Sequence, residues 1–259
     1  MSVSSTPSTE PARVPIATEP QQCGNCRAEL TGRYCATCGQ RTDVRELSAR
    51  GLIARFFGEL TSLERPLLRT LRGVLSRPGV VASDYVRGQR VRYTNPIKWA
   101  LLSTGLAFLV GRVIGSEGPV RLDVDPSTEM PGWARPIFEF LASNAAPLFV
   151  LLLLPLLAMT MRLCFRGTGR KFAEELVLVL YAYGAASLVQ VAYAPLALLG
   201  APANLGGPLP LIWTAWAAVA FHAKRRAVTS VLLTLLAHVL WIGVLGALAG
   251  VALLVNSWF

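Results

Sequence analysis

The sequence predicts an all-α polytopic membrane protein with about five transmembrane helices, amphipathic juxtamembrane helices and a small cysteine-rich N-terminal ribbon. Three observations lead to this fold class. The 259 residues are 53% hydrophobic and 15% charged, whereas soluble domains carry about 25% charged residues. Long apolar runs follow residue 97, and the mean hydropathy is +0.47. Four cysteines lie in two C-x-x-C pairs near the N-terminus.

Composition divides the chain into four regions. The first twenty residues are rich in Ser, Thr and Pro and have no apolar core, so we expect a disordered tail rather than a secretory signal. A cytosolic N-terminus is then expected, where cysteines stay reduced. The tail, the ribbon, the basic helices and the transmembrane domain correspond to residues 1–20, 21–41, 45–96 and 97–255.

The cysteines follow the pattern C-x2-C-x8-C-x2-C, at Cys23, Cys26, Cys35 and Cys38. The two-residue gap lets both thiolates of a pair reach one ion, and four sulfurs match the closed tetrahedral shell of structural zinc. Gly24 and Gly39 are expected to permit tight turns. We therefore expect one zinc ion, which supplies the folding energy of a ribbon too small for a hydrophobic core. Two unrelated cysteine pairs and a redox dithiol are the alternatives.

The region from Leu47 to Leu75 has apolar residues at helical spacing, with arginines on the opposite side. Ser48 is a suitable N-cap, and Pro66 is expected to divide or kink the run. Helices of this kind either lie in the membrane interface or form a cytosolic hairpin that packs on the spans. The sequence supports these two interpretations equally.

The most distinctive stretch is Arg77–Pro96, RPGVVASDYVRGQRVRYTNP, which carries four arginines directly before the first apolar run. Pro78-Gly79 should end the preceding helix, and Asn95 should cap the helix that Pro96 begins. Arginines beside lipid favour contact with anionic headgroups or a partner protein, although they could also serve topology alone. The candidate lipid- or partner-binding residues are Arg77, Tyr85, Arg87, Arg90, Arg92, Tyr93 and Asn95.

The order of the motifs YCATCGQ, RPG, YVRGQR and RYTNP before a first span resembles an uncharacterised family of bacterial integral membrane proteins, a domain of unknown function. The resemblance is specific over residues 22–110 and looser over the later spans. It implies an integral protein of the bacterial inner membrane with a zinc-ribbon head. It implies no activity and no catalytic residues.

Five apolar segments are predicted to span the membrane, because about 20 helical residues cross ~30 Å of hydrocarbon. They are residues 97–114, 145–163, 176–199, 209–223 and 227–255. With the N-terminus inside, Arg112, Arg121 and Arg135 fall outside, which leaves 22 of the 25 Lys and Arg residues inside. This distribution satisfies the positive-inside rule and places the C-terminus outside. The fourth segment is short, but without its crossing Lys224–Arg226 would lie outside.

Gln190 and His238 are the candidate polar residues inside the membrane. An interhelical hydrogen bond is the default role of Gln190, and His238 could donate to a neighbouring backbone carbonyl. No acidic residue falls within the five segments, which disfavours a cation-coupled carrier. The sequence contains no nucleophile elbow, H-E-x-x-H or P-loop.

The sequence favours a non-enzymatic protein whose zinc head and arginine-rich segment bind anionic lipid or a protein partner. A small transporter or permease component is the alternative, and a lipid-active membrane enzyme comes third. The net charge of +10 would suggest nucleic acid for a soluble protein. Here the basic residues flank apolar runs, so nucleic acid is a disfavoured partner. The oligomeric state does not follow from the sequence.

Overall fold

The structure, a computed structural model, describes residues 22–41, 48–58, 66–114, 146–199 and 208–256. The predicted tail and the loop predicted between the first two spans lie outside these ranges. Within them the regular elements are helices, and two isolated β-bridges lie in the cysteine-rich region. The helices are α1 (Ala49–Gly58), α2 (Pro66–Ser76), α3 (Pro78–Val86), α4 (Pro96–Ile114), α6 (Ala146–Cys164), the 3-10 turn η1 (Arg166–Thr168), α7 (Phe172–Leu198), α8 (Leu209–Phe221) and α9 (Ala227–Asn256).

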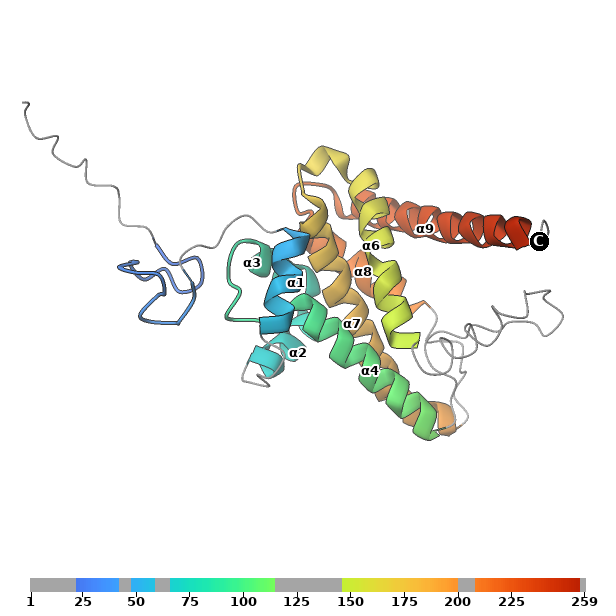
Figure 1. The fold of residues 1–259 in the computed structure, drawn as a ribbon, viewed down its shortest axis with the longest axis horizontal. Coiled ribbons are helices and arrows are strands. Elements are labelled where there is room, and N and C mark those ends of the chain that lie inside the picture. The colour runs from blue at the N-terminus through green and yellow to red at the C-terminus, as the bar shows by residue number, and fades with distance from the viewer. Residues whose placement is uncertain (1–21, 42–47, 59–65, 115–145, 200–207, 257–259) are drawn as a thin grey trace, which may run out of the picture.

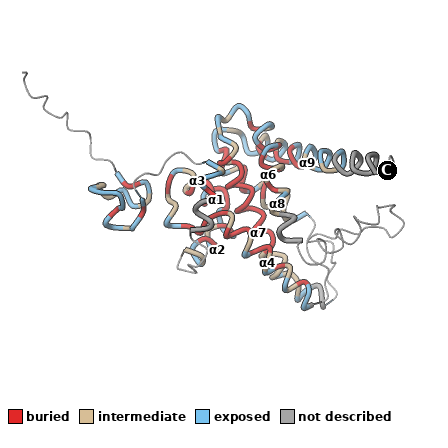
Figure 2. The backbone as a smooth tube through the Cα atoms, in the orientation of Figure 1, coloured by how far each residue is buried: buried red, intermediate tan, exposed pale blue. Residues whose placement is uncertain are grey.

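Two helices are long and apolar enough to cross a membrane, Phe172–Leu196 within α7 and Ala227–Ala247 within α9. They differ in their surroundings, because 67% of the apolar window of α7 is buried against 22% for α9. Figure 1 shows α9 extending away from the other helices, and Figure 2 shows burial concentrated along α7. α9 exposes large apolar side chains such as Leu232, Val239 and Ile242. An apolar surface of this kind normally contacts lipid or protein.

The helix in the fourth predicted span is shorter than expected. α8 has 13 residues, which extend about 20 Å at 1.5 Å per residue, compared with ~30 Å of hydrocarbon. Its side is covered by protein, since the Trp213 indole donates to the Val74 carbonyl of α2 at 3.1 Å. A Cβ at Gly79 of α3 would lie 2.1 Å from the Ala217 carbonyl oxygen. Only glycine permits this approach of α3 to α8.

α4 packs along α7, and aromatic side chains donate hydrogen bonds to backbone carbonyls at this contact. The Trp99 indole donates to the Tyr181 carbonyl at 3.3 Å, and the Tyr181 hydroxyl donates to the Thr94 carbonyl at 2.6 Å. A Cβ at Gly184 would lie 2.5 Å from the Trp99 indole nitrogen. The absence of a side chain at Gly184 therefore lets the two helices meet closely.

Residues 77–96, which we call the collar, connect the N-terminal helices to the bundle. Asn95 accepts from the Ile97 amide at 3.0 Å and donates to the Leu52 carbonyl at 3.3 Å. It therefore caps α4, as the sequence predicts, and holds α1. The Thr94 amide donates to the Thr70 hydroxyl at 2.8 Å, which holds α2. The N-terminal helices thus pack on the bundle, as the hairpin interpretation expects.

We predict that Asn95→Ala lowers the free energy of unfolding by about 2 kcal/mol, since it removes a helix cap and a buried hydrogen bond worth about 1 kcal/mol each. Thermal unfolding of the detergent-solubilised protein measures the change. Gln89→Ala is the control, because the Gln89 side chain bonds only to the exposed Arg92 in the part of the chain that is described. Equal effects of the two substitutions would contradict the role of Asn95.

Candidate functional site

The cysteine-rich head, residues 22–41, consists of two knuckles with the same backbone pattern. The Cys23 and Cys35 amides donate to the carbonyls of Ala28 and Gln40, at 2.8 and 2.7 Å. Each cysteine carbonyl accepts from the amide four residues later, at Arg27 or Gly39. These two residues have positive φ, 63° and 72°. The expectation of a tight turn is confirmed at Gly39, but in the first knuckle the left-handed residue is Arg27 rather than Gly24.

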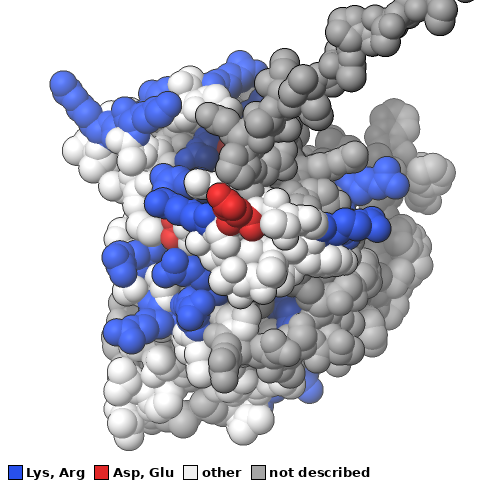
Figure 3. Space-filling view, turned by 90° about the vertical axis from the view of Figure 1, so that its left-hand side faces the viewer, with Lys and Arg blue, Asp and Glu red and all other residues white. Residues whose placement is uncertain are grey.

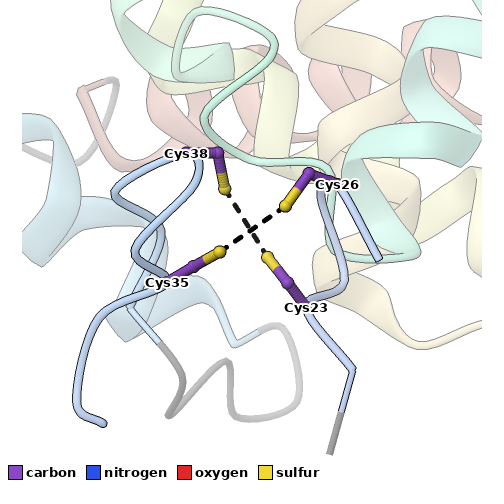
Figure 4. A group of neighbouring side chains, drawn as sticks. All are labelled: Cys23, Cys26, Cys35 and Cys38. Atoms are coloured by element: carbon purple, nitrogen blue, oxygen red, sulfur yellow. Dashed lines mark hydrogen bonds between the residues drawn. The ribbon is translucent and has the colours of Figure 1, made fainter. Parts of the chain in front are cut away.

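The four cysteine sulfurs point toward one centre (Figure 4) and lie within 4.8 Å of one another. Two pairs are closer, Cys23 with Cys38 at 3.6 Å and Cys26 with Cys35 at 3.5 Å. These distances exceed the ~2.05 Å of a disulfide bond. They approach the roughly 3.8 Å separation of sulfurs placed tetrahedrally 2.3 Å from a metal ion. The donor set and its geometry therefore fit one four-coordinate metal ion.

The head also favours thiolate at one ligand. Backbone amides of Cys38 and Thr37 lower the pKa of the Cys35 thiol to about 6. The backbone amide of Ala28 acts in the same direction on Cys26, but desolvation and the neighbouring sulfurs raise the pKa of Cys26 to about 12. Four thiolates this close repel one another unless a cation lies between them. A bound cation would stabilise the fully ionised set.

The collar separates its predicted binding residues into an exposed and a buried set. Arg77 and Arg92 are exposed, Arg87 has 71% of its side chain exposed, and Arg90 is half-buried. Figure 3 shows Lys and Arg gathered on the face that carries the N-terminal helices. The exposed arginines leave a basic surface next to the start of α4.

Tyr85, Tyr93 and Asn95 are buried. The Tyr85 ring meets Tyr181 edge to face, with centroids 5.9 Å apart. The Tyr93 hydroxyl donates to Asp84 at 3.2 Å, and burial raises the pKa of Tyr93. These three side chains hold the collar together, so lipid or partner binding in this conformation rests on the arginines.

The two polar residues predicted inside the membrane lie on different helices. His238 of α9 is buried, and its Nδ1 lies 2.9 Å from the Thr234 carbonyl oxygen. This is the local hydrogen bond that the sequence suggests. Its ring packs on Trp241, whose indole donates to the Leu153 carbonyl of α6 at 3.3 Å. Gln190 is half-buried on α7.

Sequence reasoning missed a buried acid–base pair. The carboxylate of Glu175 in α7 lies 3.4 Å from His222 Nε2, which follows α8, and both side chains are fully buried. The imidazole stacks on Phe165 with centroids 3.9 Å apart. In the described part of the chain neither group has a hydrogen-bond partner. The expectation that no acidic residue lies within an apolar span is wrong, because the candidate span begins at Phe172.

In the sequence, Glu175 looks like an ordinary acidic residue at the start of a helix. Acidic residues are common in the first turn of a helix, where the helix dipole favours them. Glu174 and Glu175 therefore look like a pair of N-terminal residues. The rise in hydropathy begins at Leu176, one residue too late to include Glu175. Only the position of α8 shows that Glu175 faces a histidine.

Together these features define a helical protein with a four-cysteine head, a basic collar and two helices able to cross a membrane. A family model described as "Protein of unknown function (DUF3667)" matches residues 64–108, which cover α2, α3, the collar and most of α4. This match and the cysteine cluster fit an uncharacterised family with a zinc-binding head. No curated protein and no solved structure matches the chain.

We predict that the purified protein binds one metal ion at pH 8 and releases it as the pH falls, because metal binding requires deprotonated thiols. Protons compete with the metal for the four thiolates, so acid displaces the metal. Metal release to a colorimetric chelator between pH 8 and pH 5 measures this dependence. Cys38→Ser should lose the metal at pH 7.5, whereas Cys164→Ser should retain it. Equal metal content in the two variants would contradict the assignment.

We predict that Glu175→Gln lowers the free energy of unfolding by about 1–3 kcal/mol, because the buried His222 loses the carboxylate that it faces. Glu174→Gln is the matched control, since Glu174 pairs with Arg170 and both side chains remain partly exposed. Pairs that solvent reaches contribute about 0–1 kcal/mol. Unfolding of the detergent-solubilised proteins compares them. The double variant Glu175→Leu with His222→Phe should recover most of the loss. A Glu175→Gln effect no larger than the control would contradict the proposed pairing.

Proposed function

We propose that this chain is a non-enzymatic integral protein of the bacterial inner membrane that binds anionic phospholipid through its collar. A zinc ribbon, formed by the head, is the second part of this proposal. The observation that carries it is the exposed surface beside α4, where arginines of the collar and of α2 lie near exposed leucines of α2.

Zinc is the metal that we propose for the head. Four thiolates from two knuckles are typical of structural zinc sites, which are closed to substrate. In the described head, Cys23 and Cys35 are buried and belong to the small core of this region. Such a site supplies folding energy and no reaction, because every coordination position is taken by the protein.

The topology that we propose has five spans, with the N-terminus in the cytoplasm and the C-terminus outside. The positions of Arg170, before α7, and of α3 support it. Arg170, before α7, donates to the Phe221 carbonyl at the end of α8 at 3.2 Å. α3 contacts the same end of α8 through Gly79. Arg170 and the collar thus lie at the same end of α8, as the positive-inside rule expects.

The exposed face of α2 supports contact with lipid rather than with water. Leu68, Arg72 and Leu75 recur at positions i, i+4 and i+7, so they share one face of the helix. Leu68 is 72% exposed and Leu75 is also exposed. Apolar side chains interleaved with arginine are typical of helices that lie at the level of the lipid headgroups. A purely topological role for the arginines does not require these leucines.

Charge makes the attraction substantial. A basic residue near an anionic membrane surface contributes about 1 kcal/mol. Arg77, Arg87 and Arg92 are exposed on the collar, and Arg69 and Arg72 are exposed on α2. Together they would contribute several kcal/mol to the binding of acidic phospholipid. Phosphate groups accept two hydrogen bonds from one guanidinium, which favours arginine over lysine here.

A small transporter or permease component is the second candidate function, and Glu175 is the observation that favours it. A buried carboxylate at the end of an apolar helix is a common element of proton pathways. A lipid-active membrane enzyme is less supported, because Tyr93 and Asn95 would have to grip a phosphate and both are buried. A lipid titration distinguishes lipid binding by the collar from contact of the head with a protein partner.

We predict that Arg77→Gln, Arg87→Gln and Arg92→Gln together weaken binding of phosphatidylglycerol at least about tenfold, since each arginine contributes about 1 kcal/mol. Native mass spectrometry of the full-length protein titrated with phosphatidylglycerol or phosphatidylcholine measures it. The control replaces Arg27 and Arg33 of the head by Gln, because these residues are exposed but lie outside the collar. Equal affinity for both lipids in the unaltered protein would contradict selective binding of anionic lipid and leave a protein partner favoured.

A further inference from the structure

The head does not lie free of the helices, because one of its side chains contacts the collar. The side-chain oxygen of Gln40 accepts from the Arg90 backbone amide at 3.3 Å. The same amide lies 2.8 Å from the Gly88 carbonyl oxygen, so the hydrogen bond is shared. Gln40 is only 2% exposed. A buried amide side chain with a partner fifty residues away in the sequence is a specific contact rather than a chance approach.

Two glycines lie where the head meets the collar. A Cβ built at Gly24 would lie 3.7 Å from both the Cα and the carbonyl oxygen of Gly88, and 3.6 Å from the side-chain nitrogen of Gln40. Gly88 is itself buried and has a φ of 112°, a conformation that favours glycine. Gly24 therefore lies directly against the collar, at a distance where a Cβ would make ordinary van der Waals contact.

The position of Gln40 depends on the metal ligands. Gln40 follows Cys38 by two residues, and its carbonyl accepts from the amide of Cys35 at 2.7 Å. The second knuckle thus determines where the Gln40 side chain begins. A region of about twenty residues has too little apolar surface to fold alone, so a bound metal would stabilise both knuckles. Without metal the knuckle would lose the geometry that directs Gln40 to the collar.

We propose that metal binding docks the head on the collar through Gln40, and that this contact holds the loop Gly88–Arg92 in place. The inference rests on the proposed metal site and basic collar. Arg87, Arg90 and Arg92 lie in or next to this loop. Loss of the metal would release the loop and alter how its arginines are presented to an anionic lipid surface. Metal occupancy thereby controls the collar without any contact between the ion and the lipid.

Hydrogen–deuterium exchange of the full-length protein in detergent tests the contact directly, because the backbone amide of Arg90 is the donor. Residue-level mass spectrometry compares the metal-loaded protein, the protein treated with a zinc chelator, and Gln40→Ala with its metal retained. We expect the Arg90 amide to exchange about tenfold faster in the last two, the result of losing about 1.4 kcal/mol of protection. Thr37→Ala is the matched control, because Thr37 is exposed on the same knuckle.

The amide of Tyr85, in α3, is the internal reference and should exchange equally in all samples. Unchanged exchange at Arg90 in both the metal-depleted protein and Gln40→Ala would overturn the inference. Metal content is measured on each sample, which separates two failures. A protein that binds no metal refutes the proposed site, whereas a metal-loaded protein with an insensitive Arg90 amide refutes only the docking. Acceleration in Thr37→Ala equal to that in Gln40→Ala would also refute the role of Gln40.

Discussion

Hydrogen bonds of the buried residues Thr94 and Asn95 organise the protein where its chain enters α4. The Thr94 amide and carbonyl bond to Thr70 of α2 and Tyr181 of α7, at 2.8 and 2.6 Å. Asn95 satisfies the first turn of α4 and the Leu52 carbonyl of α1. Buried polar groups without such partners cost about 1–3 kcal/mol each. Four helices are therefore held at two consecutive residues.

This junction explains how the collar can present charge. Tyr85, Tyr93 and Asn95 are internal and anchor the segment, which leaves neighbouring arginines exposed at defined positions. Along the collar, buried residues that anchor the segment thus alternate with exposed arginines that carry its charge. The family match covers the anchored part, residues 64–108, and the cysteine cluster lies outside it. The matched segment therefore includes the whole collar together with α2 and most of α4.

Local chemistry made several features predictable. Ser48 accepts from the Gly51 amide at 3.1 Å, and Asn95 caps α4, because a cap depends on neighbours within three residues. Pro66 begins α2, since proline suits the first turn of a helix. The burial of Tyr85 was not predictable in this way. A tyrosine beside arginines could as well lie at the membrane surface, and only its contact with Tyr181 decides otherwise.

The sequence by itself determined the helical class, the four-cysteine pattern, the caps and the unequal distribution of charge, because each depends on composition or on short spacings. The tertiary structure alone decided which polar groups are internal. Glu175 meets His222, and Gln40 meets Arg90, across 47 and 50 residues of sequence. Contacts at such separations leave no periodic signal, since they arise where helices and head pack together. Their partners are set by three-dimensional proximity and not by neighbouring residues.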